Sequence, residues 1–99
     1  MENNVKIYKL IHPRNNEIRY IGKTKNSLKS RLSAHISDSK KFNNHRANWI
    51  RSLLNAGFRP IIELAEECLD DVWPEREVYW INFYKELGEK LTNTMPHVS

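Results

Sequence analysis

The stretch from residue 18 to residue 36, IRYIGKTKNSLKSRLSAHI, limits the fold of this chain more than any other part of its sequence. It begins as a β-branched and aromatic strand, breaks at Gly22, and continues with the apolar spacing of a helix. The helical part places Arg31 and His35 four residues apart and therefore on one face. Together with the tyrosine and lysines of the same stretch, this pair indicates an anion-binding site.

The strand before this stretch predicts a β-hairpin that ends in the same region. With its turn centred near Arg14, Tyr8 lies opposite Tyr20, and Gly22 lies opposite Lys6. Directly opposed residues of an antiparallel pair point to the same face, so the two phenols are expected to stand side by side. The missing side chain of Gly22 lets a ligand or another backbone approach closely.

Periodicity and end signals predict an α+β fold in the order β-β-α-α-β-α, as a single domain over residues 1–99. The expected strands are 5–11, 18–22 and about 61–65. The expected helices are a first one with Asn26 or Ser27 as its N-cap that runs to about residue 37, a second over about 45–56, and a third from near Pro74 to about 87. Residues 66–71 are interpreted as an acidic linker whose Asp70 or Asp71 caps the third helix. That helix is apolar nearly all round, which predicts that it is mostly buried. The tail from residue 89 to 99 is expected to be irregular.

Charge is distributed unevenly along the chain. The formal net charge is +4, but residues 1–50 carry eleven Lys and Arg against three Asp and Glu, a net of +8. Residues 51–99 carry five against nine, a net of −4. One basic surface that binds a polyanion is the natural interpretation, although scattered lysines also serve solubility. No apolar run is long enough to span a bilayer, and the single cysteine, Cys68, suggests a reducing, cytoplasmic setting with this thiol in the core.

Short motifs along most of the chain resemble those of the GIY-YIG nuclease family, in order and at the expected separations. The first motif reads Lys6-Ile7-Tyr8, so its glycine is replaced, and the others are Tyr20-Ile21-Gly22, Arg31 with His35, Glu77-Val78-Tyr79-Trp80-Ile81, and Leu91-Thr92-Asn93. The sequence around Glu77 is similar to that of phage and mobile-intron homing members of the family. The resemblance implies a small three-stranded antiparallel sheet flanked by helices. It also implies an endonuclease that hydrolyses DNA phosphodiester bonds with one divalent metal ion, Mg²⁺ or Mn²⁺.

The resemblance also implies a role for each matched residue. Glu77 is the expected metal ligand, because hard cations prefer oxygen ligands. Arg31 is expected to hold phosphate, Tyr8 to act as general base after nearby cations lower its pKa, and Tyr20 to orient water or phosphate. His35 is a candidate for relaying a proton or binding phosphate. The remaining candidates are Gly22, His45 and Asn93 as supporting residues, and Lys23, Lys25 and Lys29 as contacts to the DNA backbone.

Simpler interpretations of the same residues stay open at this point. Glu77 can be a structural carboxylate paired with Arg76 or Lys85, and the tyrosines an ordinary cross-strand aromatic pair. The chain can also be a nucleic-acid-binding module that keeps the fold without catalysis. The histidines and cysteine show no zinc-ligand spacing, and the sequence contains no Gly-rich phosphate loop, so neither a zinc site nor a nucleotide cofactor is expected.

Overall fold

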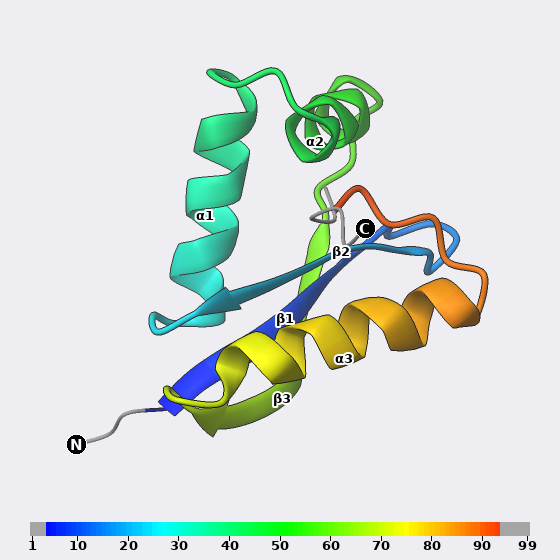
Figure 1. Ribbon diagram of the computed structural model, residues 1–99. Helices are drawn as coiled ribbons and strands as arrows, with labels where there is room; N and C mark the ends of the chain where they lie inside the picture. The colour runs from blue at the N-terminus through cyan, green and yellow to red at the C-terminus, as the bar shows by residue number, and fades with distance from the viewer. Residues whose placement is uncertain (1–3, 94–99) are drawn as a thin grey trace.

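A three-stranded antiparallel sheet lies at the centre of the computed structural model, which describes residues 4–93 (Figure 1). The central strand is β1, and the sheet order is β2-β1-β3. The elements are β1 (Asn4–Ile11), β2 (Ile18–Thr24), α1 (Leu28–Ser39), α2 (His45–Asn55), β3 (Ile61–Leu69) and α3 (Trp73–Glu86). The predicted α+β fold and its element order are confirmed. The part of the predicted irregular tail beyond Asn93 lies outside the described residues.

Helices cover both faces of the sheet (Figure 1). Alternate residues of β1 point to opposite faces, so Ile7 packs toward α3 while Tyr8 and Leu10 pack toward α1 and α2. Burial on both sides explains why five of the eight residues of this central strand are buried hydrophobic side chains. None of the helices within residues 4–93 is long and apolar enough to cross a membrane.

The register of the β1–β2 hairpin differs from the predicted one. Tyr8 pairs with Gly22 and Leu10 pairs with Tyr20, so the predicted pairs of Tyr8 with Tyr20 and of Gly22 with Lys6 are wrong. Because each partner shifts by two residues, the side-chain faces do not change. The two tyrosines remain on one face as diagonal neighbours.

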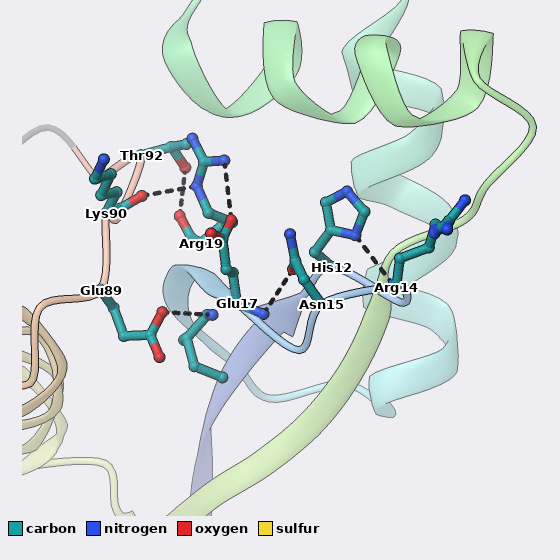
Figure 2. Close-up of polar contacts among 9 residues, drawn as sticks. His12, Arg14, Asn15, Glu17, Arg19, Glu89, Lys90 and Thr92 are labelled. Atoms are coloured by element: carbon teal, nitrogen blue, oxygen red, sulfur yellow. Dashed lines mark hydrogen bonds and ion pairs between the residues drawn. The ribbon is translucent and has the colours of Figure 1, made fainter.

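The turn between these strands explains the shift. It is centred one residue later than predicted, because β2 begins only after a loop closed by hydrogen bonds between His12 N and Glu17 O and between Asn16 N and His12 O. Asn16 has a φ of 63°, a left-handed conformation that asparagine tolerates well. The Asn15 side chain accepts a hydrogen bond from Glu17 N within the same turn (Figure 2). Such local side-chain contacts are not visible in hydrophobic periodicity.

The first two helices follow their end signals closely. Ser27 caps α1 by accepting a hydrogen bond from Ser30 N, and the helix runs to Ser39, two residues beyond its predicted end. Asn44 caps α2, which begins at His45 as predicted. Gly57, with a φ of 89°, follows its last turn.

Strand β3 is longer than predicted, and the predicted acidic linker is wrong. Residues 66–69 belong to the strand and pair with residues 4–7 of β1. An edge strand tolerates charged side chains because one of its sides stays open to solvent. The acidic composition of residues 66–69 was therefore not sufficient evidence for a loop. The carboxylate of Glu66 links β3 to α3, because it accepts hydrogen bonds from Arg76 Nε and Trp80 Nε1.

Helix α3 also differs from prediction in its cap and its burial. Its N-cap is Val72, which makes no side-chain cap hydrogen bond, so neither Asp70 nor Asp71 has the predicted role. Pro74 does lie in the first turn. Only Ile81 of this helix is buried, because α3 covers its face of a small sheet alone and turns one side to solvent. The exposed apolar side chains of α3 are Val78, Tyr79 and Phe83. Cys68 is half-buried at the rim of the same core.

Candidate active site

Tyr8 is the centre of a polar cluster buried between the sheet and α1. Its side chain is fully buried in β1. Arg31 Nε donates a hydrogen bond of 3.1 Å to Tyr8 Oη, and His35 Nε2 lies 2.5 Å from the same oxygen. Because Arg31 and His35 are one turn apart on α1, both reach Tyr8 from one helix. The structure thus brings together three of the residues that the sequence singled out.

Tyr20 lies beside this cluster on the neighbouring strand β2. Its ring centroid is 6.3 Å from that of Tyr8 and 5.4 Å from that of His35. Tyr20 is half-buried, and its hydroxyl accepts a hydrogen bond of 3.3 Å from Arg46 Nη1. Two phenols, one imidazole and two guanidinium groups therefore occupy the same face of the sheet.

Gly22 allows this cluster to close. It pairs with Tyr8 across the sheet, and a Cβ built on it would lie 2.5 Å from Tyr8 Oη and 2.7 Å from Tyr20 Cε2. Both distances are far below van der Waals contact, so any side chain here would displace the tyrosines. The close approach is made by the Tyr8 side chain itself.

Burial dominates the electrostatics of the cluster. It raises the pKa of Tyr8 to about 12, with Tyr20 adding to the shift, while Arg31 and Arg46 oppose it. The arginines act in the predicted direction, but burial outweighs them. Burial, Arg31 and Arg46 lower the pKa of His35 to about 3. At neutral pH both Tyr8 and His35 are therefore uncharged.

The low pKa of His35 predicts acid sensitivity. The folded form stays unprotonated down to about pH 3, whereas the unfolded chain binds a proton below its ordinary pKa of 6.5. Stability from this group is therefore complete above pH 6.5 and is lost as pH falls toward 3, at up to about 1.4 kcal/mol per pH unit. Thermal unfolding of wild type and His35→Gln across this window is the measurement. Equal slopes for the two proteins would contradict the prediction.

Glu77 does not join the tyrosine cluster directly. It lies on α3, which covers the opposite face of the sheet, and it is half-buried. Burial raises the pKa of its carboxyl group, and Lys23 of the edge strand β2 opposes that rise. Lys23 follows Gly22 in the chain, so Glu77 is electrostatically linked to the same edge of the sheet.

The Glu77 carboxylate has no basic partner within residues 4–93. Arg76, one of the two partners considered from the sequence, donates to Glu66 instead, at 2.8 Å. The described part of the chain contains no group of three acidic, histidine or cysteine side chains that could hold a metal. A single desolvated carboxylate nevertheless suits Mg²⁺, which usually keeps several waters and takes one or two protein carboxylates plus substrate oxygens.

The three lysines predicted to meet DNA lie in different surroundings. Lys29 is exposed on α1. Lys23 is also exposed, with its Nζ 4.6 Å from the Trp73 ring centroid. Lys25 forms an ion pair of 3.1 Å with Asp70, which offsets part of its charge.

Residues 90–93 hold the edge strand β2 in place through hydrogen bonds. Asn93 Oδ1 accepts from Ile21 N at 3.0 Å, and Asn93 Nδ2 donates to Ile21 O at 2.7 Å. Thr92 donates through N and Oγ1 to Arg19 O, and Arg19 Nε donates to Lys90 O (Figure 2). These bonds satisfy the backbone of an edge strand that is otherwise open, and they fix the strand that carries Tyr20.

The structure places Arg46 of α2, rather than its neighbour His45, beside the tyrosine cluster. His45 is exposed, and within residues 4–93 its side chain forms no hydrogen bond with the cluster. Arg46 reaches it instead, through the hydrogen bond to Tyr20 and a position 5.2 Å from the centroid of that ring. A cation in the first turn of a helix opposes the helix dipole, and this is the one sequence signal that could have drawn attention to Arg46.

A family model described as GIY-YIG catalytic domain matches residues 4–91. The chain has no significant match among curated proteins or among solved structures.

Proposed function

This chain belongs to the GIY-YIG nuclease family, and from that premise we propose that it is a metal-dependent endonuclease that hydrolyses DNA phosphodiester bonds. The contact of Tyr8 Oη with both Arg31 and His35 is the observation that carries the proposal. A buried phenol held between a fixed cation and a neutral imidazole is an arrangement for moving a proton beside an anion. An ordinary aromatic pair would not require either partner.

Arg31 is the phosphate-binding group in this proposal. Its Nε is occupied by Tyr8, which leaves the terminal nitrogens of the guanidinium group to donate to phosphate oxygens. Arg31 is only half-buried, so these donors can reach a bound backbone. Its charge stabilises the additional negative charge that develops on the phosphate during attack by water.

Tyr8 is the general base, and His35 receives the proton that Tyr8 gives up. With His35 neutral and its Nε2 beside Tyr8 Oη, the phenol proton passes to that nitrogen as Tyr8 takes a proton from the attacking water. The imidazolium that forms is unfavourable at rest because of burial and both arginines. A phosphate bound to Arg31 offsets that cost, so the transfer is coupled to substrate binding. Tyr20 orients the water or the phosphate.

Glu77 is the residue that would hold the divalent metal, Mg²⁺ or Mn²⁺. Its fit rests on a half-buried carboxylate without a basic partner in residues 4–93, with a pKa raised by burial. When bound, such an ion neutralises charge on the phosphate and activates water. We assign the contacts with the DNA backbone to Lys23, Lys25 and Lys29. The ion pair with Asp70 offsets part of the charge of Lys25.

The direct test is nicking of supercoiled plasmid by the purified protein. We expect conversion to open circles or linear DNA with Mg²⁺ or Mn²⁺, and no conversion when a chelator removes the ion. Gel electrophoresis of time courses measures both. Retention of DNA in a binding assay without cleavage in either metal would instead identify a nucleic-acid-binding module with this fold.

A further inference from the structure

We propose that Arg46 is a second phosphate-binding residue of the site, which contacts the DNA backbone from α2 while Arg31 contacts it from α1. This inference rests on the proposed nuclease function and adds a residue to it. It assigns to Arg46 the position that the sequence suggested for His45. The clamp would consist of one guanidinium group beside each tyrosine.

Position is the first support. Arg46 lies in the first turn of α2, two residues after the cap Asn44, where the helix dipole disfavours a cation. Its guanidinium carbon is 5.2 Å from the centroid of the Tyr20 ring, and Nη1 donates to the Tyr20 hydroxyl at 3.3 Å. The aromatic ring and hydroxyl therefore hold the arginine in one orientation over the site.

Unused hydrogen-bonding capacity is the second support. Within the part of the chain that the structure describes, Tyr20 is the hydrogen-bond partner of Arg46, and no carboxylate pairs with it. The remaining N–H groups of its planar fork are free, and Arg46 is half-buried rather than fully solvated. By contrast, Arg51 on the same helix donates hydrogen bonds to Ser39 O and Phe42 O, at the end of α1 and in the connection between α1 and α2. Its role is therefore structural.

Mutual repulsion is the third support. Arg31 and Arg46 both act on Tyr8 and His35: they oppose the rise in the pKa of Tyr8 and help to lower the pKa of His35, so the fields of the two cations overlap at these two side chains. The two cations repel each other, because neither forms an ion pair with a carboxylate within residues 4–93, although the charge of Asp38 acts on Arg31. A phosphate diester that accepts from both would remove this repulsion, and its oxygens suit the bidentate geometry of arginine.

The test uses the full chain and a short double-stranded oligonucleotide. Binding is measured in chelator over a range of salt concentrations, and single-turnover cleavage is measured with Mg²⁺. For Arg46→Ala we expect DNA affinity to fall by about tenfold or more, the size of one charge-assisted hydrogen bond. The slope of log affinity against log salt should fall in magnitude by about one, because one phosphate contact is lost.

Two variants make the result specific. Arg46→Lys keeps the charge and loses the fork, so the salt slope should return to the wild-type value while affinity recovers only in part. Arg59→Ala removes an exposed arginine outside the cluster and should match wild type in cleavage. Melting temperature is recorded for every variant.

The outcomes separate this inference from the function on which it rests. If wild type binds and cuts DNA but Arg46→Ala has the same salt slope and affinity, the inference is overturned and the nuclease function stands. An Arg46→Ala protein with a lower melting temperature and an unchanged salt slope also overturns it, since the contact with Tyr20 is then structural alone. If wild type neither binds nor cuts, both proposals fail.

Discussion

Arg31→Ala is expected to reduce single-turnover DNA cleavage by orders of magnitude while the protein keeps its fold. The variant removes the charge proposed to hold the phosphate and, at the same time, the donor to Tyr8 Oη. Loss of the phosphate contact weakens transition-state stabilisation, and loss of the donor frees the phenol that must be positioned for attack. The other cationic residue of α1, Lys29, is exposed and forms no hydrogen bond or ion pair with the cluster among residues 4–93, so we do not expect it to replace Arg31.

The cost of this substitution to stability should be small. Arg31 is half-buried, and its Nε donates a hydrogen bond to the buried Tyr8 hydroxyl. Leaving that hydroxyl with His35 as its partner costs about 1 kcal/mol, the value typical of one hydrogen bond. Circular dichroism and thermal unfolding of Arg31→Ala and Arg59→Ala measure this cost. Cleavage by Arg31→Ala at near the wild-type rate would remove Arg31 from the mechanism.

Local signals in the sequence were sufficient to predict the order and type of all six elements. Caps and glycines act within a few residues, so the starts of α1 and α2 follow from Ser27 and Asn44. The hairpin register depended on hydrogen bonds inside the turn that composition does not reveal. The end of β3 depended on pairing with β1 over a separation of more than fifty residues, which no local pattern encodes.

The same distinction applies to the site. The spacing of Arg31 and His35 is local, and the structure places both against Tyr8. Arg46 reaches Tyr20 only because α2 packs against α1 and the sheet, so its role could not be deduced from neighbouring residues. The sequence placed Glu77 in the third helix, but it did not predict that this helix covers the face of the sheet opposite Tyr8. Residue types and local spacing could be identified from the sequence, but the packing of one helix or strand against another could not.

The position of Glu77 on α3, across the sheet from Tyr8, makes Glu77→Gln the most informative single substitution. Glutamine keeps the size and hydrogen bonding of the side chain and removes the charge that a hard cation requires. If Glu77 holds the metal, single-turnover cleavage should fall by orders of magnitude, because phosphate neutralisation and water activation both depend on the ion. DNA affinity measured in chelator should stay level or rise, since a negative charge near the basic Lys23 has gone.

Stability distinguishes this role from a structural one. Burial raises the pKa of the Glu77 carboxyl group, so folding makes its charged form less favourable than it is in the unfolded chain. Glu77→Gln should therefore melt at the same temperature as wild type or higher in chelator, and it should lose any stabilisation that Mg²⁺ gives to wild type. Glu86→Gln, an exposed carboxylate on the same helix, is the matched control. A Glu77→Gln protein that melts lower yet cuts DNA at the wild-type rate would contradict the metal assignment, because the carboxylate would then support the helix and not the chemistry.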